Sequence, residues 1–319
     1  MTTVDSGSQG ATALATASEP AGTAESARPA PSAPRRAGPG PWQSAGAVAA
    51  LAVLFLVGFF VYLYALSYPS ETHAQAAMFK NFVAELQQGT APVAPSTTNQ
   101  TTGASTPLAE GSPVAVLNVP QIGLRDVVVV DGTTSRDMAL GPGRVRASAL
   151  PGQEGVSFIY GKVATYGAPF AHLMRLNRGD RFTVTTGQGT STYMVESFGT
   201  SSKPAPADAA NRLVLETAAP GIWPSSAVQV NSVLVSAPQP NPGDWPQITS
   251  AEADMGRDTA DGLVPLALWS QALLLAVLVS TVGVYRWSRW RTYLLMAPVV
   301  MALTWCVYEN MAVLLPNLY

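Results

Sequence analysis

Long apolar runs occur at three places in the chain. Residues 44–67 contain no charged side chain, and residues 262–286 contain none before Arg286. Residues 292–315 are also mostly apolar, although they include Glu309. About 20 apolar residues in an α-helix span the hydrocarbon core of a bilayer. The pattern therefore predicts one N-terminal and two C-terminal transmembrane helices.

Arginine residues predict how these helices are oriented. The connection between the last two helices reads RWSRWR, and residues 1–43 also carry three arginines. Positively charged connections tend to stay in the cytoplasm. We therefore expect a multi-pass cell-membrane protein with a cytoplasmic N-terminus, a cytoplasmic loop at 287–291 and an extracytoplasmic region after the first helix. Residues 1–43 contain few large apolar side chains and are predicted to be a disordered leader.

Residues 70–89 show the periodicity of a further α-helix just outside the membrane. Thr72 and Gln75 fit a capping box at its start, and Gly89 fits its end. Residues 90–111 are rich in Thr, Ser and Pro, and residues 238–261 are polar and rich in Pro. Both segments are predicted to be linkers.

Residues 112–237 change to a pattern of short β-rich runs. The runs read PVAVLNV, DVVVV, VSFIY, RFTVTT, STYMVESF, RLVLET and VQVNSVLVS. Turn-forming motifs such as GPG, PGQEG and GQG separate them. Many short strands and few helices predict a mainly β domain, a closed β-barrel of seven to eight strands.

Composition excludes several function classes. Lys and Arg total 18 and Asp and Glu total 20, so no basic excess favours nucleic acid as a partner. The single cysteine, Cys306, lies in a predicted membrane helix, which leaves no intrachain disulfide and no cysteine metal site. The two histidines, His73 and His172, are far apart in sequence and do not form a metal-ligand pattern. We therefore expect neither a metal nor another cofactor.

The order of several motifs within the β-rich region carries a family resemblance. The motifs are LNVPQIGLRDVVVVDGTTSRDMALGPGRVRASALPG, TYGAPF, HLMRLNRGDRFTVTT and RLVLETAAP. Together they resemble sortases, especially the class E type of actinobacteria. The resemblance implies a sortase-like β-barrel. It also implies an extracytoplasmic cysteine transpeptidase, which cuts the sorting signal of a secreted protein and joins the new end to a cell-wall or pilin amine.

The resemblance also implies three catalytic groups: a cysteine nucleophile, a histidine acid and an arginine that stabilises the oxyanion. At the matching positions this chain has Ala218, Lys162 and, for the arginine that opens the last strand, Ser232. The sequence therefore predicts that no residue is catalytic by the family mechanism, and that the protein is a pseudoenzyme.

An altered nucleophile is a weaker alternative. A Thr217 hydroxyl activated by Lys162 would be a known type of chemistry. Against it, Thr217 is read as a residue that fills a β-position, and Lys162 as a solvated cation at a turn in an open groove. His172 is expected to be a half-exposed loop residue. The residues predicted to line a binding groove are Tyr160, Lys162, Tyr166, Phe170 and Thr217.

These patterns predict a membrane-anchored binding or accessory module in cell-surface protein display or envelope assembly. The expected partners are the lipid bilayer and a secreted or cell-wall protein or a true sortase. One rival is a transpeptidase or hydrolase of sorting-signal peptides that uses Thr217 with Lys162. Another is a barrel that serves as a spacer, with function in the C-terminal helices.

Overall fold

The computed structural model describes residues 41–98, 105–200, 211–219, 226–241, 263–286, 289–315 and 318. The chain forms two compact units, Met1–Ala50 and Leu51–Tyr319. In the first unit, the described residues are the beginning of the first helix. Residues 1–40 of the predicted leader and most of the predicted linker 238–261 lie outside the described residues.

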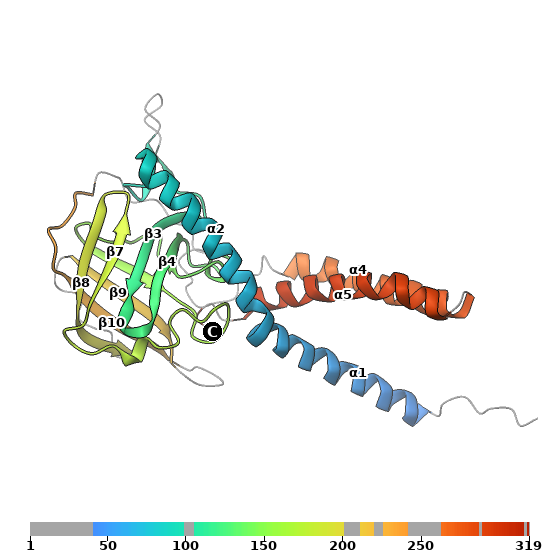
Figure 1. Cartoon of the computed structure of the whole chain (residues 1–319). Helices are drawn as coiled ribbons and strands as arrows, with labels where there is room; N and C mark the ends of the chain where they lie inside the picture. The colour runs from blue at the N-terminus through green and yellow to red at the C-terminus, as the bar shows by residue number, and fades with distance from the viewer. Residues whose placement is uncertain are drawn as a thin grey trace, which may run out of the picture. The chain divides into compact units, whose positions relative to one another are not determined.

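Eight strands of the second unit close into a barrel (Figure 1). Their order around the barrel is β10-β8-β7-β3-β4-β5-β6-β9. The β4–β5 and β6–β9 pairs are parallel, and the remaining neighbours are antiparallel. The strands are β3 (Pro113–Val119), β4 (Leu124–Asp131), β5 (Gly143–Arg144), β6 (Val156–Tyr160), β7 (Arg181–Thr186), β8 (Gly189–Thr200), β9 (Arg212–Ala218) and β10 (Ala227–Leu234). The predicted closed β-barrel is confirmed.

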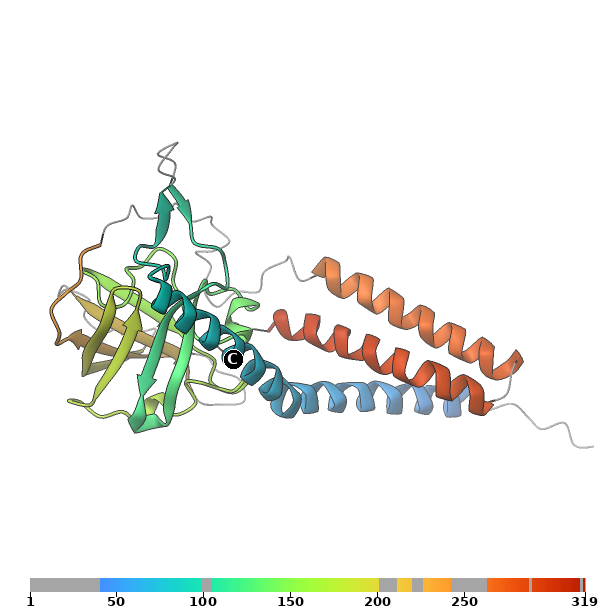
Figure 2. The same cartoon turned by 45° about the horizontal axis from the view of Figure 1, so that its top comes forward.

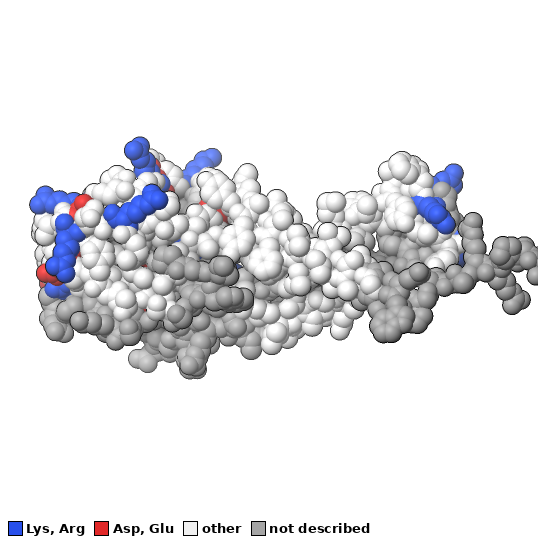
Figure 3. All heavy atoms as spheres, turned by 90° about the horizontal axis from the view of Figure 1, so that it is seen from below, with Lys and Arg blue, Asp and Glu red and all other residues white. Residues whose placement is uncertain are grey.

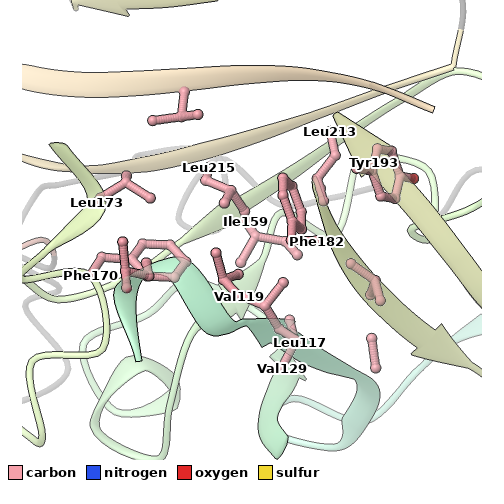
Figure 4. Packing of buried hydrophobic residues seen from close by; sticks show 14 of the residues in the cluster. Leu117, Val119, Val129, Ile159, Phe170, Leu173, Phe182, Tyr193, Leu213 and Leu215 are labelled. Atoms are coloured by element: carbon pink, nitrogen blue, oxygen red, sulfur yellow. The ribbon is translucent and has the colours of Figure 1, made fainter. Parts of the chain in front are cut away.

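Alternate residues of the strands fill the barrel. Leu117, Ile159, Leu213 and Leu215 are fully buried in one apolar cluster, and Figure 4 shows them packed together. The rings of Phe182 and Tyr193, from neighbouring strands, stack with centroids 5.8 Å apart in the same core. Each such side chain contributes about 1.5–3 kcal/mol when it is removed from water. The core therefore follows directly from the alternating pattern of the β-rich runs.

The N-terminal helical region is continuous, which differs from the two separate helices predicted. Helix α1 (Pro41–Val61) passes through the π-helical turn η1 (Tyr62–Leu66) into α2 (Ser67–Gln88). The predicted capping box is wrong, because Thr72 lies inside α2 and its hydroxyl donates to the Tyr68 carbonyl, 2.9 Å away. The predicted helix end is confirmed: Gly89 follows α2 with a left-handed φ of 67°.

Helix α2 lies along β3 and β4 of the barrel (Figure 2). Gln75, which was predicted to cap the helix, instead hydrogen-bonds the barrel main chain. Its side-chain amide donates to the carbonyls of Val128 (3.0 Å) and Leu140 (2.7 Å), and its carbonyl accepts from Val128 N at 2.8 Å. Phe82 of α2 packs in an apolar cluster with Val128. The helix is thus part of the barrel domain.

A short hairpin interrupts the segment that was predicted to be a linker. Strand β1 (Ser96–Thr98) pairs antiparallel with β2 (Ser105–Pro107). The segment 90–111 therefore contains a pair of short strands. Its Ser, Thr and Pro content carries no apolar alternation, so the sequence pattern does not indicate these strands.

Two further helices follow the barrel in the chain. Helix α4 (Leu263–Arg286) and α5 (Arg289–Val313) pack side by side. Within the described residues, three helical segments are long and apolar enough to cross a membrane: Ala49–Gln88, Leu263–Arg286 and Arg289–Val313. On the face shown in Figure 3, charged side chains gather on the barrel and at the helix ends, and the described helical surface between them carries none.

Candidate functional site

The ladder between β9 and its neighbours positions the site. Leu213 and Leu215 of β9 point into the core. Successive side chains of a strand point to opposite faces, so Glu216 and Ala218 point away from the core. Tyr160 of β6 pairs with Glu216, and Gln229 of β10 pairs with Glu216 from the other side. These three residues form one row across three strands.

The next row contains the positions at which the family resemblance implies catalytic groups. Ala218 pairs with Ala227 across the β9–β10 ladder. On the other side, Gly161 N donates to the Glu216 carbonyl at 3.0 Å, so the β6–β9 ladder continues beyond Tyr160. Lys162 is the second residue after Tyr160, and Ala218 is the second residue after Glu216, the ladder partner of Tyr160. We call Lys162, Ala218 and Ala227 the degenerate row, because none of them is the residue type that the family resemblance implies.

Ser232, which the resemblance matches to the arginine that opens the last strand, does not open that strand. The last barrel strand opens at Ala227, whereas Ser232 lies five residues further along and pairs with Leu213. Five residues of β-strand span about 17 Å. Ser232 is fully buried, and its hydroxyl has no hydrogen-bond partner among the described residues. The position that opens the strand and faces Ala218 is Ala227.

The row formed by Tyr160, Glu216 and Gln229 is polar and hydrogen-bonded. The Gln229 side-chain amide donates to Glu216 Oε2 at 2.9 Å. Burial raises the pKa of Glu216, while hydrogen bonds from Gln229 and Tyr160 act in the opposite direction. Burial, together with the charge of Glu216 and the hydrogen bond to it, raises the pKa of Tyr160. The sequence analysis included Tyr160 in a groove but did not identify Glu216 or Gln229. In LVLET and VQVN these two polar residues alternate with apolar residues, and this pattern could have indicated them.

Lys162 is buried, which corrects its reading as a solvated cation in an open groove. Its side chain is 2% exposed, and burial lowers its pKa to about 8. Its Nζ lies 5.4 Å from the ring centroid of Tyr166, a cation–π distance. Its carbonyl accepts from Phe170 N at 3.1 Å, which closes the loop after β6 over it. The chain therefore holds an amine with a depressed pKa at this position.

Two residues of the predicted groove point into the barrel instead. Phe170 is 1% exposed and belongs to the core cluster (Figure 4). Thr217 is on the same face of β9 as Leu215 and is 1% exposed. The Thr217 hydroxyl donates to the Gly161 carbonyl at 2.7 Å. This hydroxyl holds the end of β6 against β9, and it faces away from Ala218.

Tyr166 connects the loop after β6 to the helices. It is 6% exposed and lies in an apolar cluster. The other buried members of this aromatic cluster are Phe59, Tyr62, Leu63, Tyr308 and Ala312. Tyr166 N donates to Ser67 Oγ at 3.2 Å. In the same loop His172 is exposed and comes just before a short 3-10 helix, Leu173–Arg175.

The described residues contain no group of three or more His, Cys, Asp and Glu side chains placed to hold a metal ion. The degenerate row offers two methyl groups and one buried amine. Alanine carries no nucleophile and no charge, so neither Ala218 nor Ala227 can attack a peptide carbonyl or stabilise an oxyanion.

Residues 117–219 match the family model described as the Sortase domain. Among solved structures, the chain is similar to sortase E from Streptomyces avermitilis, with 27% identity, a TM-score of 0.35, and coverage of 40% of this chain and 91% of that chain. A Clostridium perfringens Sortase D5 transpeptidase shares 16% identity with a TM-score of 0.40, over 51% of this chain and 99% of that chain. No curated protein matches the sequence.

The closed eight-stranded barrel and the family match define the class of the domain. The barrel, with its match to the Sortase domain model over residues 117–219, has the sortase fold. Sortase E1 from Streptomyces coelicolor, solved with a tripeptide in its active site, is a further similar structure, with 23% identity, a TM-score of 0.35, and coverage of 40% of this chain and 90% of that chain.

Proposed function

We propose that this chain is a membrane-anchored sortase-family protein without sortase catalysis, and that it acts as a peptide-binding or accessory module in cell-surface protein display or envelope assembly. The observation that carries the proposal is the degenerate row of Lys162, Ala218 and Ala227. Sortase chemistry requires a thiolate that attacks, an acid that protonates the leaving amine and a cation for the oxyanion. Here the first and last positions carry methyl groups.

The three apolar helical segments support membrane anchoring. Large apolar side chains on α4 and α5 are exposed to a degree that is unusual for a soluble surface, for example Leu274 at 70% and Met301 at 72%. Exposed arginines flank the connection between α4 and α5. By the positive-inside rule this connection is cytoplasmic and the barrel is extracytoplasmic. This side of the membrane is where a secreted or cell-wall protein would be met.

The polar row beside the degenerate row supports peptide binding. Glu216 supplies a carboxylate acceptor, Gln229 an amide and Tyr160 a phenol, all on the face of the sheet that points away from the core. A small number of placed polar groups among apolar residues suits recognition of an extended peptide. Loss of the catalytic groups leaves this row in place.

The test uses the full-length protein in lipid nanodiscs with a fluorescent sorting-signal peptide and an amine acceptor. Anisotropy reports binding, and mass spectrometry reports cleavage or transpeptidation. We expect saturable binding without any new product. Gln229→Ala removes the donor to Glu216 and should weaken binding several-fold, whereas the exposed Thr190→Ala on β8 should not. Cleaved or transferred peptide from the wild-type protein would overturn the proposal.

A second candidate function rests on the depressed pKa of Lys162. An amine with a pKa of about 8 is a suitable general base for a hydroxyl nucleophile. The nearest candidate, Thr217, donates its hydroxyl to Gly161 and faces the core. This function requires hydrolysis or transfer that is abolished by both Lys162→Arg and Thr217→Val. We expect no such turnover, and we expect both variants to bind the peptide like the wild type.

A further inference from the structure

The last described residues of the chain lie against the loop that carries Lys162. Val163 N donates to the Leu318 carbonyl at 3.2 Å. Val163 is the residue after Lys162, so this contact is next to the degenerate row. It joins positions that are more than 150 residues apart in the sequence.

A second hydrogen bond holds the same part of the chain. Ser135 Oγ donates to the Leu315 carbonyl at 3.2 Å. Ser135 is 2% exposed and lies between β4 and β5, whereas Val163 lies after β6. Two carbonyl groups, three residues apart, thus accept from two different loops of the barrel. Leu315 also packs against the aromatic cluster.

Both contacts use carbonyl groups of the C-terminal segment as acceptors. Main-chain hydrogen bonds are one way in which a protein holds a peptide independently of its side chains. The carbonyl groups of Leu315 and Leu318 are held to the barrel in this way, although they belong to the same chain.

Helix α5 delivers this segment to the barrel. The helix ends at Val313, only two residues before Leu315. Upstream, the Tyr308 hydroxyl donates to the Phe55 carbonyl at 2.8 Å, and Ala312 is 2% exposed in the aromatic cluster. A short tether to a fixed point gives a high effective concentration, in the millimolar range for short linkers.

We propose that the C-terminal segment at Leu315 and Leu318 is an intramolecular ligand of the barrel. It binds the loop after β6, beside Lys162, and competes with a peptide bound in trans. The competition rests on the proposed peptide-binding function, whereas the intramolecular contact does not. Movement of α5 in the membrane then changes this competition, because one residue joins the helix to Leu315.

The contact itself is tested by cross-linking in membranes. In a Cys306→Ser background, Val163→Cys paired with Leu318→Cys should form a disulfide on mild oxidation, because residues joined by a main-chain hydrogen bond lie within disulfide reach. The control pairs Thr190→Cys, an exposed residue at the start of β8, with Leu318→Cys and should not form one. Absence of the first cross-link in folded protein would overturn the intramolecular contact.

The competition is tested by peptide binding to a chain that ends after Leu315. This truncation removes Leu318 and keeps the aromatic cluster. In nanodiscs it should bind the fluorescent sorting-signal peptide at least about tenfold more tightly than the full-length chain. The cross-linked full-length protein should bind about tenfold more weakly than the same protein after reduction. Unchanged affinity in both comparisons would overturn the competition.

The two proposals fail in different ways. If the cross-link forms but no variant binds the peptide, the proposed function fails and the intramolecular contact stands. If the peptide binds and the cross-link does not form, the contact fails and the proposed function stands. If the truncation does not fold, the effect of reducing the cross-linked full-length protein decides the competition.

Discussion

Ala227 lies directly opposite Ala218 across the β9–β10 ladder. Both residues are on the face that points away from the core, and both are almost fully buried, at 9% and 4% exposure. Two methyl groups therefore face each other, one of them at Ala218, the position at which the family resemblance implies the nucleophile. This relationship predicts that side chains can be exchanged at Ala227 with much less damage than at Ser232.

The first prediction compares arginine at these two positions. Ala227→Arg should fold, since Ala227 is the first residue of β10 and its side chain can extend along the outer face. Ser232→Arg places a charge inside the barrel and should destabilise it severely, by more than about 4 kcal/mol. Thermal unfolding followed by circular dichroism measures the difference. Equal stability of the two variants would show that the β10 register is wrong.

A matched control uses the same position with a small residue. The Ser232 hydroxyl is buried without a partner among the described residues. Replacing an unsatisfied buried polar group by an apolar one is neutral or favourable. Ser232→Ala should therefore melt at the same temperature as the wild type or higher, so that the loss in Ser232→Arg can be assigned to the charge.

The second prediction concerns the pH dependence of stability. Burial lowers the pKa of Lys162 from 10.5 to about 8, so the unfolded state binds more protons than the folded state between these values. The free energy of unfolding should therefore rise with pH from about 8 to 10.5, by about 3 kcal/mol from this group. Below pH 8 both states are protonated, and the contribution is constant.

Lys162→Met isolates this contribution because methionine cannot titrate and has a similar length. The variant should show a flatter dependence of stability on pH between 8 and 10.5 than the wild type. The control, Lys80→Met, changes an exposed lysine of α2 and should retain the wild-type slope. The same slope in Lys162→Met and in the wild type would mean that Lys162 is solvated.

The strands that could be predicted are those in which apolar and polar residues clearly alternate. LVLET and VQVN place apolar residues on one face, so β9 and β10 follow from the sequence. Strand β5 has only two residues, Gly143 and Arg144, and no periodicity can be read from two residues. The sequence GPG before it is typical of a turn. For the same reason the polar strands β1 and β2 did not stand out.

The candidate site was predictable only in part. Lys162 and Ala218 were assigned through the family resemblance, since each follows a recognisable strand. The third position was assigned to Ser232 because no arginine marks it, and only the ladder shows that β10 opens at Ala227. The burial of Lys162 could not be predicted, because the residues around its loop, including Tyr62 and Tyr308, come from helices far away in sequence.

The third prediction concerns a buried ion pair that holds β4 and β5 together. Arg144 is fully buried and donates from Nε to Asp131 Oδ1 at 2.9 Å; its Nη2 donates to the same oxygen and its Nη1 to the Ser148 carbonyl. Arg146 Nε lies 3.2 Å from Asp131 Oδ2. Removing one partner of a buried pair leaves a charge that water cannot reach.

Arg144→Met should therefore lower the free energy of unfolding by about 3–5 kcal/mol. The matched control is Arg212→Met, which breaks the ion pair with Glu196, a residue that is 49% exposed. A pair with one exposed partner contributes about 1 kcal/mol or less. Urea or thermal unfolding of the two variants should differ by several kcal/mol. Similar stabilities would mean that the Arg144–Asp131 pair is compensated in the variant.

The last prediction tests which side of the membrane the barrel occupies. Two single-cysteine variants are made in a Cys306→Ser background, with Thr190→Cys on the exposed start of β8 and Ser288→Cys between α4 and α5 in the sequence. On intact cells an impermeant thiol reagent should label the first and not the second, because the arginines around residue 288 favour the cytoplasm. After the membranes are permeabilised, both should be labelled, which shows that each thiol is reactive. Labelling of only Ser288→Cys on intact cells would reverse the orientation. The barrel would then face the cytoplasm, where it could not meet a secreted or cell-wall protein, and the proposed function would fail with it.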